Sequence, residues 1–66
     1  MKPGELREMS DIELQAQEAA LRESIFRLKF KLSLGETDAL KNLRQARKDL
    51  ARVETIMRER QRGVEQ

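Results

Sequence analysis

The sequence predicts an all-α protein: a single domain, residues 1–66, that forms an antiparallel two-helix hairpin of the coiled-coil kind with a short N-terminal helical turn. Three observations support this prediction. The chain is 39% charged, rich in Leu, Ala, Glu, Lys and Arg, and has one Pro and three Gly, which is typical of long helices. No stretch alternates apolar and polar residues as a strand does. Apolar residues instead recur at heptad spacing in two segments, one on each side of Gly35.

The N-terminal segment KPGELRE can form one helical turn around Leu6, which Pro3 and Gly4 keep from extending upstream. The N-terminus has no apolar core like that of a signal peptide. No apolar run approaches the roughly 20 residues that span a bilayer. We therefore expect a cytoplasmic protein that has no membrane partner.

The first long helix is expected over residues 11–34. Ser10 lies three residues before Glu13, which is the spacing of a capping box, and Met9 and Leu14 occupy the positions of a hydrophobic staple. No Gly or Pro interrupts the chain from there to Gly35. A residue that tolerates positive φ suits the position just after a helix.

The first helix has apolar residues on two sides. One side is a coiled-coil seam with Glu18 in its polar slot, and its apolar members are Leu14, Leu21, Ile25, Leu28 and Leu32. The opposite stripe contains Ile12, Ala19, Phe26, Phe30 and Leu34. Periodicity alone does not decide which side faces the second helix. The uncovered side is either folded under by the turn through Leu6 and Met9 or buried against a partner, and we expect a protein interface at Phe26, Phe30 and Leu34.

A turn over residues 35–38 and a second helix over residues 39–62 follow, with a frayed tail at 63–66. Thr37 or Asp38 can cap this helix. Its seam repeats at steps of four and three, through Ala39, Leu43, Ala46, Leu50, Val53 and Met57. One continuous helix in a dimer is the alternative, but LGETD combines a helix-stopping Gly with two cap-type residues and favours a hairpin.

The basic residues are concentrated on the second helix. Residues 40–62 contain eight basic and three acidic side chains, a net charge of +5. At 100° per residue, Lys41, Arg44, Lys48 and Arg52 form a row opposite the seam. Thr55 lies beside the row, and Arg47 and Arg58 flank the seam. Like charges four residues apart repel unless an anion answers them, and phosphate is the natural counterpart. The alternative is an ordinary solvated helix face.

Catalysis and metal binding have little basis in this sequence. There is no Cys and no His, so zinc clusters of Cys and His and imidazole general-base chemistry are excluded. The serines have no His to activate them. A two-helix hairpin cannot enclose a small-molecule substrate. We therefore expect neither an enzyme nor a cofactor, metal or small-molecule substrate.

Several blocks of the sequence together resemble the bacterial ribosomal large-subunit protein family twenty-nine. These blocks are ELREMSDIEL, IFRLKFKLSLG, KNLRQARKDLARVET and IMRERQ, and the resemblance runs from about Met1 to Gln61. It implies two long antiparallel helices with a short N-terminal helical piece. Glu36 and Glu54 depart from the family pattern, which commonly has a glutamine and a basic residue there, and both weaken the attraction to RNA.

The resemblance also implies a function and partners. The family is a structural part of the ribosome that binds large-subunit ribosomal RNA near the nascent-peptide exit tunnel. Its neighbour there is large-subunit protein twenty-three, where targeting factors and chaperones dock. The RNA contacts that this implies are Arg7, Lys41, Arg44, Arg47, Lys48, Arg52 and Thr55.

Two other function classes fit parts of the sequence. A coiled-coil module that pairs with another protein and binds no RNA would explain the stripe that holds Phe26 and Phe30. A membrane-surface helix fits poorly, because the seam opposite the basic row is narrow and contains alanine.

Overall fold

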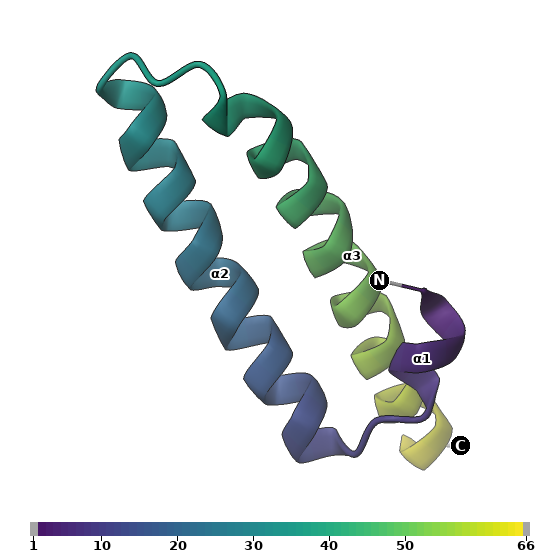
Figure 1. Cartoon of the computed structure of the whole chain (residues 1–66). Helices are drawn as coiled ribbons and strands as arrows, with labels where there is room; N and C mark the ends of the chain where they lie inside the picture. The colour runs from purple at the N-terminus through teal and green to yellow at the C-terminus, as the bar shows by residue number, and fades with distance from the viewer. Residues whose placement is uncertain (1, 66) are drawn as a thin grey trace.

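The computed structural model describes residues 2–65, with side chains described to residue 63. Three helices follow one another along the chain: α1 (Pro3–Arg7), α2 (Asp11–Ser33) and α3 (Ala39–Glu65). The two long helices run antiparallel, and α1 lies across α3 at the end of the molecule away from the α2–α3 turn (Figure 1). The molecule is a rod of 47 × 17 × 17 Å. This arrangement confirms the predicted helical hairpin with its short N-terminal helix.

The start of α2 is capped as expected. The Ser10 Oγ accepts a hydrogen bond of 3.2 Å from the Glu13 backbone N–H, and the Ser10 hydroxyl donates to the Glu13 carboxylate at 3.1 Å. The first of these bonds satisfies one of the N–H groups that the first helical turn leaves without a partner. Asp11 and Glu13 also place negative charge at the positive end of the helix dipole.

Gly35 ends α2 and starts the turn to α3. Its φ of +89° lies in the left-handed region that favours glycine. The Gly35 N–H donates to the Leu32 carbonyl at 3.0 Å, and the Glu36 N–H donates to the Lys31 carbonyl at 3.1 Å. This pair of bonds is the Schellman motif. The turn of the hairpin thus depends on a glycine just after the end of α2, as the sequence indicated.

The leucine seam of α2 faces α3. Leu14 is fully buried, and Leu21, Ile25, Leu28 and Leu32 are half-buried. On α3, the buried residues are Ala39, Leu43, Ala46, Val53 and Ile56. The opposite stripe of α2 is exposed to solvent. The choice between the two sides of α2 is thereby decided.

The N-terminal helix packs against the core at the end of the hairpin away from the α2–α3 turn (Figure 1). Leu6 of α1 is fully buried and forms a cluster with Leu14, Val53 and Ile56. Met9 is half-buried against the same cluster. The turn through Leu6 and Met9 therefore packs on α3 and the start of α2, and it leaves the outer stripe of α2 uncovered.

Two helix ends differ from the predicted boundaries. Helix α2 ends at Ser33 with Leu34 as its C-cap, one residue earlier than expected. Helix α3 continues to Glu65, so the expected tail at 63–65 is helical, and residue 66 lies outside the described residues. Gly63 does not stop the helix because a glycine inside a helix costs only about 1 kcal/mol relative to alanine.

Candidate nucleic-acid interface

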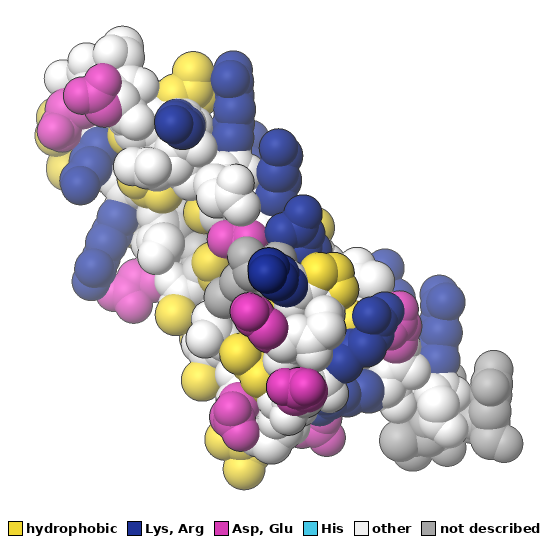
Figure 2. All heavy atoms as spheres, turned by 45° about the vertical axis from the view of Figure 1, so that its right-hand side comes forward, with side chains coloured by type: hydrophobic (Ala, Val, Ile, Leu, Met, Phe, Trp, Pro, Cys, Tyr) yellow, Lys and Arg dark blue, Asp and Glu magenta, His cyan; other side chains and the backbone are white. Residues whose placement is uncertain are grey.

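The basic row lies on the exposed face of α3. Lys41, Arg44, Lys48 and Arg52 are exposed, while Leu43, Ala46 and Val53 on the same helix are buried. The helical period causes this division, because the row lies roughly 180° around α3 from the buried seam. Figure 2 brings the α3 side of the rod forward and shows Lys and Arg side chains recurring along its length.

Few carboxylates neutralise this row. Among the side chains that the structure describes, none forms an ion pair with Lys41, Arg44 or Lys48, whereas Arg52 lies 3.9 Å from the Asp49 carboxylate. Arg47 and Arg58, which flank the seam, are also exposed. Lys and Arg spaced by three or four residues on an open helix face can contact the phosphates of an RNA backbone. Such contacts position a protein on the RNA without reading the base sequence.

Helix α1 adds Arg7 to this surface. The packing of Leu6 beside Ile56 brings Arg7 next to Arg52 and Thr55 at an open hollow. Arg7 also lies 3.8 Å from the Glu59 carboxylate and remains 59% exposed. The structure therefore brings three of the seven predicted RNA contacts together, although Arg7 is more than 40 residues away from the others in sequence.

The hydroxyl of Thr55 is already engaged. It donates a hydrogen bond of 2.7 Å to the Ala51 carbonyl one turn earlier on α3. While this bond holds, Thr55 can accept a hydrogen bond from a ligand but cannot donate one to a phosphate. Thr55 is exposed on α3, the helix that carries the basic row. Its hydroxyl can act toward a ligand only as a hydrogen-bond acceptor while the bond to Ala51 holds.

Glu54 does not lie in the basic row. It is half-buried on the flank of α3 that faces α2, and its carboxylate accepts a hydrogen bond of 3.0 Å from Arg22. Arg22 also lies 3.6 Å from Glu18 on its own helix. The negative charge of Glu54 is thus paired with Arg22 across the hairpin. It therefore lowers the positive potential of the basic row less than its place in the sequence suggested.

The outer stripe of α2 is a second exposed surface. Phe26 is 73% exposed, Phe30 61% and Leu34 64%, and Ile12 extends the stripe toward the other end of α2. Large apolar side chains gathered on one helix face are typical of surfaces that contact another protein. The predicted protein interface is therefore accessible, on the side of the hairpin away from α3.

Comparison with known proteins identifies the family. A family model described as ribosomal L29 protein matches residues 4–60. The chain belongs to the ribosomal L29 protein family. The relatives are named large ribosomal subunit protein uL29. The chain is 48% identical to that of Carboxydothermus hydrogenoformans over 92% of its own length and 88% of the relative's. It is 44% identical to that of Natranaerobius thermophilus, over 97% and 98% respectively.

A third L29-family relative, from Listeria welshimeri, is 43% identical over 92% of this chain and 97% of its own length. No solved structure matches the chain. The part that the L29 family model matches includes all seven residues of the predicted RNA interface. Within residues 2–65, the structure holds no helix long and apolar enough to cross a membrane, and no group of three or more His, Cys, Asp or Glu that could hold a metal.

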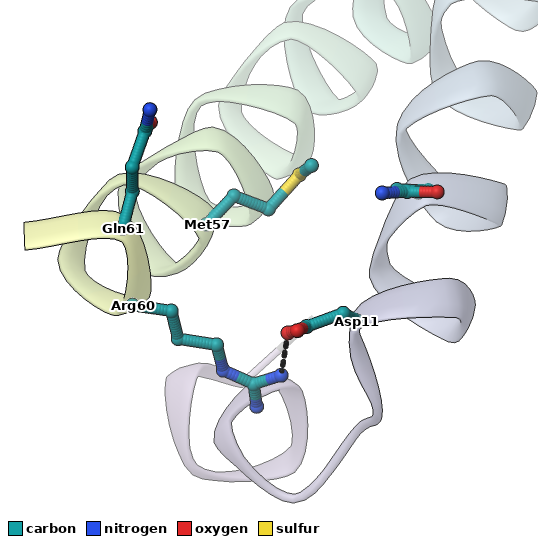
Figure 3. A pocket seen from close by; sticks show the side chains of 5 residues that line it. Asp11, Met57, Arg60 and Gln61 are labelled. Atoms are coloured by element: carbon teal, nitrogen blue, oxygen red, sulfur yellow. Dashed lines mark hydrogen bonds and ion pairs between the residues drawn. The ribbon is translucent and has the colours of Figure 1, made fainter. Parts of the chain in front are cut away.

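Arg60, where the L29-family match ends, has a role that sequence reasoning missed. Its guanidinium donates to the Asp11 carboxylate at 2.9 Å (Figure 3). It also donates to the Arg7 carbonyl at 2.9 Å. Arg60 thereby ties α3 to the chain on both sides of the α1–α2 turn. It lies seven residues after Val53, in the heptad register of the seam. A charged residue at a seam position predicts that its side chain pairs with a specific partner. This position was the sequence signal for the role of Arg60.

Proposed function

We propose that this protein is a structural component of the large ribosomal subunit in the cytoplasm, and that it binds large-subunit ribosomal RNA through the exposed basic row of α3. The observation that carries the proposal is this row, Lys41, Arg44, Lys48 and Arg52, on a chain of the L29 family. Arg7, Arg47 and Thr55 complete the proposed RNA contacts. Such a surface binds by releasing counterions from the phosphates.

The proposal includes a place in the subunit and a protein neighbour. The protein lies near the nascent-peptide exit tunnel beside large-subunit protein twenty-three, where a targeting factor or chaperone docks. The stripe of Phe26, Phe30 and Leu34 supports a protein contact, because it faces away from the RNA-binding helix and is apolar and exposed. One hairpin can therefore contact RNA on its α3 side and protein on its α2 side.

The salt dependence of binding tests the RNA interface. Each phosphate contact contributes about −0.9 to the slope of log affinity against log salt, so the four-residue row contributes about −3.6 to this slope. In the triple variant Arg44→Glu, Lys48→Glu and Arg52→Glu, the magnitude of the slope should fall by at least about 2.7. We also expect the variant to be absent from large subunits after a high-salt wash. The measurement is filter binding to large-subunit ribosomal RNA across a salt series.

A charge-matched control separates the row from overall charge. The variant Arg27→Glu, Lys29→Glu and Lys31→Glu changes the net charge by the same amount, but on exposed positions of α2. It should keep most of the salt slope. Wild-type binding that barely responds to salt would contradict the proposal, as would equal losses in the two variants.

The competing function is a protein-interaction module that binds no RNA, and the exposed Phe26 and Phe30 are the observation in its favour. Analytical ultracentrifugation distinguishes the two functions. A stable homodimer without affinity for ribosomal RNA would support the module. A monomer with salt-dependent affinity would support the ribosomal function.

A further inference from the structure

Arg60 holds the chain on both sides of the α1–α2 turn. One terminal nitrogen of its guanidinium donates to the Asp11 carboxylate and the other donates to the Arg7 carbonyl, each at 2.9 Å. Arg7 is the last residue of α1, and Asp11 is the first residue of α2. A helix of one turn is not stable by itself, because nucleation costs more free energy than its few hydrogen bonds return. The position of α1 therefore depends on the burial of Leu6 and on the bonds of Arg60.

Arg60 itself lies away from the basic row. Its side chain is 31% exposed and points toward Asp11, across the end of the hairpin (Figure 3). Lys48, in the row, lies twelve residues before Arg60, so the two are about 120° apart around α3. Both terminal nitrogens of Arg60 already donate to acceptors within the protein. Arg60 is therefore not placed to contact the phosphates that the row would bind.

Arg7 brings its side chain to the face that carries the row. Its guanidinium lies 3.8 Å from the Glu59 carboxylate and is 59% exposed. Glu59 lies eleven residues after Lys48, so the two are only about 20° apart around α3. Helix α3 thus presents an acidic side chain where the basic row would continue. Arg7 brings a positive charge from α1 to that place.

We propose that Arg60 is a positioning residue of the RNA interface, which holds the end of α1 so that Arg7 binds a phosphate beyond the end of the row. The inference rests on the proposed function, in which Arg7 contacts RNA and Arg60 does not. Arginine suits the role because its planar fork bonds two acceptors at once, whereas lysine offers one nitrogen. Without these bonds, Leu6 still packs α1 on α3, but the main chain at Arg7 loses the anchor that sets its direction.

Substitution of Arg60 tests the inference. Arg60→Met removes both bonds and keeps an unbranched residue that favours a helix. Arg60→Lys keeps the charge but offers one nitrogen in place of the fork. The matched control is Arg22→Met, because Arg22 also joins α2 to α3, through Glu54, and its loss removes the same charge without touching α1. Arg7→Met and the double variant Arg7→Met with Arg60→Met complete the set.

The measurement is filter binding to large-subunit ribosomal RNA across a salt series, and circular dichroism checks that each variant folds. Arg7→Met and Arg60→Met should each lower the magnitude of the salt slope by about 0.9, the contribution of one phosphate. The double variant should also lose about 0.9, because both changes remove the same contact. Arg60→Lys should show this loss at unchanged charge, whereas Arg22→Met should keep the slope.

Three results would overturn the inference and leave the proposed function standing. The first is an additive loss of about 1.8 in the double variant, which would mean that Arg60 contacts RNA independently of Arg7. The second is a full slope in Arg7→Met or in either folded variant of Arg60. The third is an equal loss in Arg22→Met, which would assign the effect to charge or general stability. Wild-type binding that barely responds to salt would instead contradict the proposed function.

Discussion

Replacing Leu6 by alanine should detach α1 from the molecule while α2 and α3 stay packed against each other. Leu6 is fully buried in a cluster with Leu14, Val53 and Ile56, and Leu→Ala at such a site costs about 2–5 kcal/mol. A chain of 66 residues has a total stability of roughly 3–10 kcal/mol at typical values per residue. The five residues of α1 can undock on their own, so we expect a loss near the lower limit, about 2 kcal/mol.

Native-state hydrogen exchange measures this loss and locates it. Backbone amides held by α1, such as the Leu6 N–H to the Lys2 carbonyl and the Met9 N–H to the Leu6 carbonyl, should lose protection in Leu6→Ala. Amides of α3 near Leu43 should keep it. The matched control is Leu34→Ala, because Leu34 is 64% exposed and its removal should change stability by no more than about 0.5 kcal/mol. Unchanged protection in α1, or equal loss along the whole of α3, would refute the reasoning.

Two further predictions concern the turn and the outer stripe. Gly35→Ala should destabilise the protein by about 1 kcal/mol because the φ of +89° is strained for alanine. Gly63→Ala should stabilise it by up to about 1 kcal/mol, since the added methyl meets open space inside α3; thermal melts that move both variants in one direction would contradict this pair. Phe26→Ser with Phe30→Ser should leave the melting temperature nearly unchanged and abolish capture by purified large-subunit protein twenty-three, and retained capture would count against the protein interface.

Local chemistry made most of the hairpin predictable. Ser10 and Glu13 form the expected cap, and Gly35 has the positive φ that its place after a helix indicated. The heptad steps of α3 correctly separated Leu43 and Val53 from Arg44 and Lys48. These features depend on residues within a few positions of one another, and sequence patterns report such neighbours directly.

Contacts between distant segments were beyond the reach of periodicity. The outer stripe of α2 drifts around the helix, because Phe26, Phe30 and Leu34 are spaced by four and four, whereas the seam alternates threes and fours. This difference is compatible with the packing of the seam, but the packing side of α2 was established by the burial of Leu14 in the structure. The burial of Ile56 under α1 and the bonds of Arg60 join residues about 50 positions apart. The heptad position of Arg60 indicates that it has a partner, but the identity of that partner is not encoded in any local pattern.

The rod is only two helices thick, 17 Å across. No core residue lies deeper than one layer of side chains, so the free protein has little cohesion of its own. A ligand that binds only the folded form adds RT ln(1 + [L]/Kd) to its stability. A protein that binds RNA on its α3 side and another protein on its α2 side would gain stability from both ligands. Its fold would then be completed by the assembly that receives it, and unassembled copies would be the first to be degraded.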